Sequence, residues 1–69
     1  MTGFSVKETC ERDNIMIQSC RVCDDFETSY FVSVYDKTAL EEVECLDAKN
    51  AEENDALFAK TVERYFGVN

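Results

Sequence analysis

Hydrophobic and polar positions alternate through the first half of the chain with the period of a β-strand. Phe4, Val6 and Cys10 are separated by polar residues, which indicates a half-buried first strand. Polar residues 11–14 and the acidic stretch 23–28 then interrupt the apolar runs and predict turns. The pattern therefore predicts three strands, over residues 3–10, 15–22 and 29–36.

The next segment, residues 40–46, fits two patterns. Leu40, Val43 and Leu46 have helical spacing, but the same stretch can also extend the sheet. A turn directly after the third strand would form a hairpin, so we favour a fourth strand and keep a helix as the alternative.

Residues 48–66 form the predicted C-terminal helix. Asp47 is placed to cap its first turn, and Asn50, three residues before Glu53, is a second candidate cap. Gly67 follows the last apolar position and supplies the stop.

One apolar stripe on this helix is expected to lie on the sheet, interrupted by Asn54 and Asp55. Val68, just after the stop, is expected to contact Val62. The stripe consists of Ala51, Phe58, Val62 and Tyr65, flanked by Phe66.

These elements predict an α+β fold, a three- to four-stranded antiparallel meander with the C-terminal helix packed on one face. Alternation assigns residues to the two faces of the sheet. The helix-covered face is expected to hold Phe4, Val6, Cys10, Ile15, Ile17, Tyr30, Val32 and Val34, joined by Val43 and Cys45 if the fourth strand pairs through a short turn. The opposite face is expected to hold Met16, Cys20, Val22, Phe31 and Tyr35 beside Ser5, Lys7, Thr9, Gln18, Ser33, Glu42 and Glu44.

The opposite face is the candidate functional surface, because a contiguous apolar patch on a face that is normally wet indicates a docking site. The alternative is that strand propensity alone selected these aromatic residues. Met16, Val22, Phe31 and Tyr35 are the predicted anchor for a partner. Asp24, Asp25, Glu42 and Glu44 are predicted to steer a basic partner towards it.

Composition narrows the classes of partner. The 69 residues predict a single domain, 1–69, and fifteen acidic against seven basic residues give a net charge of −8. That charge disfavours direct binding of nucleic acid or anionic membrane and favours a protein partner with a basic surface. The chain shows no signal-peptide core and no long apolar run, so a cytoplasmic location is expected.

Catalytic and cofactor motifs are not found in the sequence. Histidine is absent, so no imidazole base or Cys-His nucleophile pair exists, and we expect neither an enzyme nor a cofactor. The alternative is a zinc-stabilised module, because four thiolates are enough for a tetrahedral site. Its ligands would be Cys10, Cys20, Cys23 and Cys45, but two of these are isolated singles rather than a close pair.

In size, acidity and order of elements the chain resembles small phage-encoded inhibitors such as anti-CRISPR proteins. The resemblance implies stoichiometric binding to a host nucleoprotein complex in the bacterial cell, by occupying a nucleic-acid groove or by holding subunits inactive. Separately, the distribution of acidic residues along the chain can imitate the charge of a nucleic acid backbone, which would make the protein a DNA mimic. Plain solubility is the other explanation of the acidity. A self-associating accessory protein, a possible homodimer, is a further alternative.

Overall fold

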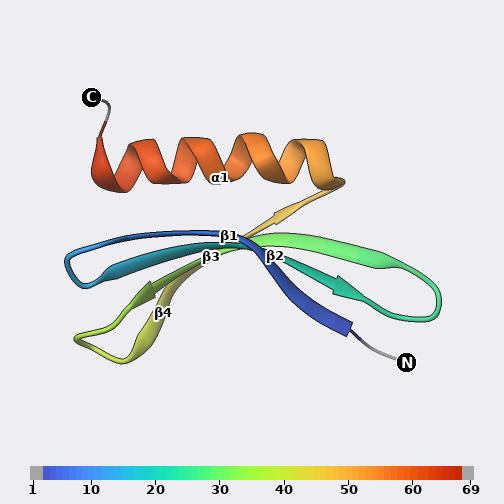
Figure 1. Ribbon diagram of the computed structural model, residues 1–69, viewed down its shortest axis with the longest axis horizontal. Helices are drawn as coiled ribbons and strands as arrows, with labels where there is room; N and C mark the ends of the chain where they lie inside the picture. Colours follow the sequence, from blue (N-terminus) through green and yellow to red (C-terminus); the bar gives the residue numbers. More distant parts are fainter. Residues whose placement is uncertain (1–2, 68–69) are drawn as a thin grey trace.

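The chain forms a four-stranded antiparallel sheet followed by one helix that packs on a single face of it (Figure 1). The computed structural model describes residues 3–67. The strands follow one another in the order β1-β2-β3-β4, so the predicted α+β meander is confirmed and the ambiguous fourth segment is a strand. The elements are β1 (Gly3–Arg12), β2 (Ile15–Cys23), β3 (Thr28–Asp36), β4 (Glu41–Ala48) and α1 (Ala51–Phe66).

The core lies between α1 and the two central strands. Ile17 of β2 and Val32 and Val34 of β3 are fully buried, and Phe58 of α1 covers them. β-branched residues suit this position because they pack well on a pleated surface. Cys10, Ile15, Leu57, Val62, Tyr65 and Phe66 pack around this centre.

The helix begins three residues later than the first cap predicted. Asn50 is the N-cap, with φ of −153°, and its side-chain oxygen accepts a hydrogen bond of 2.8 Å from the Glu53 N–H. Asp47 as N-cap was therefore the wrong choice: β4 continues until Ala48 pairs with Tyr30, which keeps Asp47 in the sheet.

The C-terminal end of α1 follows the prediction. Gly67 has φ of 81°, a left-handed conformation that favours glycine, and its N–H donates to the Glu63 carbonyl at 2.8 Å. The predicted contact of Val68 lies outside the described residues.

The sheet-facing side of α1 is more polar than the predicted stripe. Ala51 is exposed, whereas Asn54 and Thr61 are buried, at 2% and 1% exposure. The Thr61 hydroxyl donates to the Leu57 carbonyl at 2.7 Å, which satisfies it within the helix. The Asn54 amide donates across the interface to β2, so a position expected to interrupt the stripe is part of it.

An irregularity in β1 overturns part of the face assignment. Pairing with β2 shifts between Val6 and Glu8, and this β-bulge reverses the faces of the residues before it. Phe4 and Val6, predicted in the core, therefore lie on the other face and are 64% and 39% exposed. Ser5 and Lys7 move to the helix side in exchange.

A second irregularity, between Val34 and Tyr35 in the β3–β4 ladder, has the same effect on β4. Glu44 pairs with Val34 on the helix side, so Cys45, one residue later, faces away from the helix. Val43 is 49% exposed and Cys45 is also exposed. The prediction that these two residues join the core is therefore wrong. The four-residue turn before β4, closed by Leu40 with φ of 57°, replaces the short turn assumed from the sequence.

Candidate functional site: the open face of the sheet

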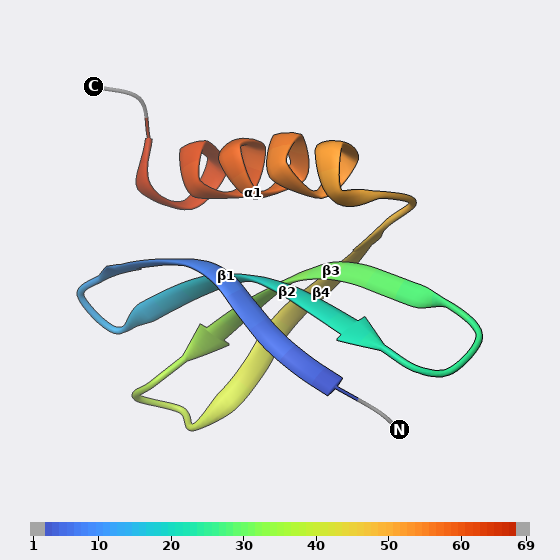
Figure 2. The same ribbon diagram turned by 45° about the vertical axis from the view of Figure 1, so that its right-hand side comes forward.

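The open face is the surface of the sheet turned away from α1. Figures 1 and 2 show the helix on one side of the sheet and no element of the described chain on the other. Strand pairing brings apolar side chains from all four strands together here, for example Val6 opposite Cys20 and Cys20 opposite Phe31. Its apolar members are Phe4, Val6, Met16, Cys20, Val22, Phe31, Tyr35 and Cys45.

The four predicted anchor residues lie on this face. Met16 is directly opposite Tyr35, while Val22 and Phe31 lie towards the β2–β3 loop, and all four are half-buried. Phe4 joins Phe31 in a tilted aromatic pair with 6.3 Å between ring centroids. Phe4 was not predicted as part of this surface, because nothing in the sequence reveals the bulge at Lys7 that turns it there.

Two thiols lie within the open face. Cys20 is 2% exposed, and burial raises the pKa of its thiol. Cys45 is exposed on β4, and the pKa of its thiol is also raised, first by partial desolvation and then by the nearby Glu42 carboxylate. Both are therefore neutral thiols at physiological pH.

The four cysteines do not assemble into the alternative zinc site. Cys10 packs against the core on the helix side, opposite Ile17, whereas Cys20 and Cys45 face the other way. Within residues 3–67 no group of three or more cysteine or acidic side chains is arranged to hold a metal ion.

Carboxylates border the apolar patch. Glu42 lies opposite Tyr35 and Asp47 opposite Phe31, so both belong to the open face. Glu11, opposite Met16, is held by an ion pair of 2.8 Å between its Oε1 and the Lys37 ammonium. The border of the apolar patch is therefore acidic, and Lys37 is engaged in the ion pair with Glu11.

Glu44 is not on this border, and its predicted placement there is wrong. It lies on the helix side, where the Arg64 guanidinium pairs with it and the Tyr65 hydroxyl donates to it at 3.2 Å. The Arg64 hydrogen bond holds the pKa of Glu44 below its usual range. Through these contacts Glu44 stabilises the packing of α1 on β4.

The predicted acidic residues Asp24 and Asp25 are both in the exposed loop between β2 and β3. The Asp24 carboxylate accepts hydrogen bonds from the N–H groups of Glu27 and Phe26, at 2.7 and 2.8 Å, which lowers its pKa. Phe26 is 97% exposed at the tip. Phe26 was absent from the predicted site, although its position between Asp25 and Glu27 in a polar turn already indicated an exposed aromatic side chain.

Comparisons with known proteins add no functional assignment to this geometry. No helix in the described range 3–67 is long and apolar enough to cross a membrane. No protein-family model, curated protein or solved structure matches the chain.

Proposed function

We propose that this protein is a non-catalytic binding domain that docks onto a protein partner through its open face. The observation that carries the proposal is the contiguous apolar surface contributed by all four strands and left uncovered by the described chain. Patches of this kind mark interaction sites, since an uncovered sheet face is ordinarily polar. The half-buried aromatic residues Phe31 and Tyr35 are suited to act as anchors because large rings dominate interface energetics.

The acidic border and the net charge of −8 favour a partner whose own apolar patch is surrounded by lysine and arginine. Glu42 and Asp47 lie directly beside the anchors, and the loop bearing Asp24 adds charge at one end of the sheet. Opposite charge speeds encounter and fixes orientation, while the buried apolar centre sets the lifetime of the complex.

The proposed class of partner is a nucleic-acid-binding protein, and the proposed effect is inhibition. A basic groove that grips phosphates matches the charge of this domain, and occupying it stoichiometrically would exclude nucleic acid. The proposal of an inhibitor of a nucleic-acid-binding protein is supported by the net charge of −8 and by the resemblance to small phage-encoded inhibitors.

The test is capture of the partner from the native cell with the immobilised protein, followed by measurement of binding with the purified partner. Phe31→Ala combined with Tyr35→Ala should raise Kd by about 100-fold or more, because each interface hot spot contributes about 2 kcal/mol. Lys60→Ala, an equally simple truncation on the exposed side of α1, should leave Kd unchanged. A double variant that is folded by circular dichroism and binds normally would refute the open face as the site.

A homodimer joined through the open face is the second candidate, favoured by the same uncovered apolar surface. It would bring Glu42 and Asp47 of two copies close together, so raised salt should strengthen it. Salt should weaken binding to a basic partner, which has the opposite charge. Light scattering across a salt series therefore separates the two functions.

A further inference from the structure

A cavity of about 320 Å³ lies on the helix side of the sheet, between the beginning of α1 and strands β1 to β3. Its size is at the lower end of the range for ligand pockets. The residues that matter for its chemistry are Lys7, Arg21, Tyr30, Ala51 and Asp55. The cavity lies on the helix side of the sheet and the open face lies on the other side, so the proposed ligand site and the proposed docking surface are different surfaces of the molecule.

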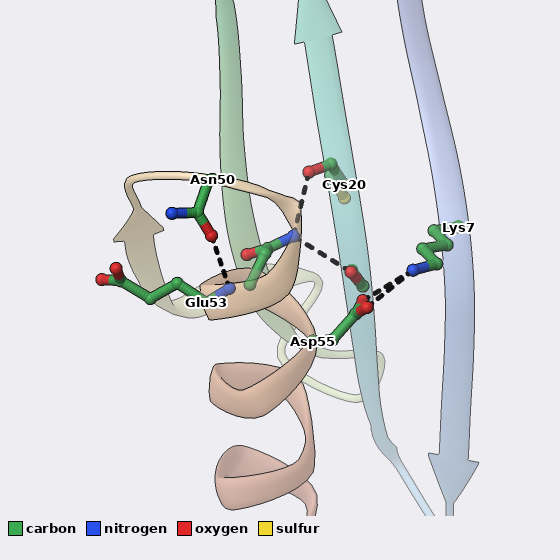
Figure 3. Close-up of polar contacts among 7 residues, drawn as sticks. Lys7, Cys20, Asn50, Glu53 and Asp55 are labelled. Atoms are coloured by element: carbon green, nitrogen blue, oxygen red, sulfur yellow. Dashed lines mark hydrogen bonds and ion pairs between the residues drawn. The ribbon is translucent and has the colours of Figure 1, made fainter.

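The charges around this cavity do not cancel. The Lys7 ammonium lies 2.8 Å from both carboxylate oxygens of Asp55, which makes a neutral pair (Figure 3). Arg21 has no side-chain hydrogen bond or ion pair within the described range 3–67. Among the three charged residues that line the cavity, one positive charge, that of Arg21, is therefore left over.

Two further features of the wall define the ligand. Ala51 is the first residue of α1, so the positive end of the helix dipole adjoins the cavity, together with the carboxylates of Glu52 and Glu53 in the first turn. Tyr30 presents a half-buried ring, which can cover the apolar body of a small molecule. The Asp55 carboxylate in the same wall disfavours a doubly charged anion.

We infer that this cavity binds a small monocarboxylate, with its carboxylate on the Arg21 guanidinium and its apolar body against Tyr30. The planar guanidinium matches a carboxylate with two parallel hydrogen bonds, so Arg21 determines the preference for this class of anion.

The test uses three probes in amide NMR titrations of the intact protein: benzoate, benzyl alcohol and inorganic phosphate. Benzoate should shift the amides of Arg21, Tyr30 and Ala51 saturably, with Kd of about 1 mM, a value ordinary for a ligand of this size. Benzyl alcohol has the same ring without the charge, and phosphate has charge without the ring, so both should bind more weakly.

Variants then locate the site. Arg21→Gln should raise Kd for benzoate by about tenfold or more, the usual effect of losing a hydrogen bond to a charged group. Lys60→Gln removes the same charge from an exposed position outside the cavity and should change Kd less than about twofold. Absence of saturable shifts, equal effects of the two variants, or tighter binding of either other probe would overturn the inference.

Discussion

Replacing Asn54 by aspartate should destabilise the fold at neutral pH through a single buried contact. Asn54 is 2% exposed, and its Nδ2 donates to the Ser19 hydroxyl at 3.1 Å and to the Cys20 carbonyl at 3.4 Å. In Figure 3 the dashed line that ends at Cys20 of β2 marks the second of these hydrogen bonds, which starts in the first turn of α1. Within the described residues the Asn54 Oδ1 is a buried acceptor without a partner, so the donors carry the contact.

Asn54→Asp keeps the shape of the side chain and changes its chemistry. The donor that faces the Cys20 carbonyl becomes an acceptor, and the new carboxylate is buried without a cation. An uncompensated buried charge costs about 3–5 kcal/mol. A chain of 69 residues has a total stability of roughly 3–10 kcal/mol, so the variant should lose much of its stability at pH 7.

The loss should depend on pH in a defined direction. Burial raises the folded-state pKa of the introduced carboxyl above its unfolded value of about 3.9. Below that value the carboxyl is protonated in both states, its O–H can donate to Cys20 or Ser19, and the difference from wild type nearly disappears. The destabilisation should appear as the pH rises above the unfolded value and should be fully developed beyond the folded pKa.

Urea unfolding of wild type and variant between pH 3 and pH 8 measures this difference directly. Asn50→Asp is the matched control: it makes the same chemical change at the exposed N-cap, where aspartate and asparagine cap equally well. A stability loss at Asn54 below about 0.5 kcal/mol at pH 7, or one that does not vary with pH, would refute the account.

Contacts elsewhere in the fold support three other predictions. Hydrogen bonds lower the pKa values of Asp24, Asp36 and Glu44 in the folded state, so the stability that these carboxylates contribute is complete above the unfolded pKa of about 4 and is lost on further acidification. The urea concentration at the unfolding midpoint should therefore decrease when the pH is lowered below about 4, and it should decrease less in the Glu44→Gln variant. Asn50→Ala should cost about 1 kcal/mol in urea unfolding, because the Glu53 N–H loses its cap, and an unchanged midpoint would contradict the N-cap assignment. A thiol reagent at pH 8 should label exposed Cys45 first and buried Cys20 only as fast as the sheet opens. Labelling is followed residue by residue by mass spectrometry, and equal rates at Cys45 and Cys20 would show that Cys20 is accessible.

The architecture was predictable because it depends on local patterns. Alternation in the segments around Ile17 and Val34 marked the central strands, and these residues need only strand geometry and one covering helix to be buried. Gly67 and Asn50 carried recognisable end signals of the helix, although the choice between Asn50 and Asp47 required knowing how far β4 extends.

The candidate site was predictable in part. Met16, Val22, Phe31 and Tyr35 lie on strands whose pairing is regular, so counting alternate residues placed them correctly on one face. Phe4, Val6, Val43 and Cys45 could not be placed in this way, because each bulge adds one residue to one strand and reverses the faces beyond it.

The sequence by itself therefore determined the order of the elements, the central core and the acidic character of the surface. Only the tertiary structure decided the membership of the open face, the attachment of Glu44 to the helix, and the cavity beside Arg21. The physical reason is that strand and helix periodicity are local properties of the chain. Bulges, long-range ion pairs and cavities depend instead on which residues the pairing of distant strands brings together.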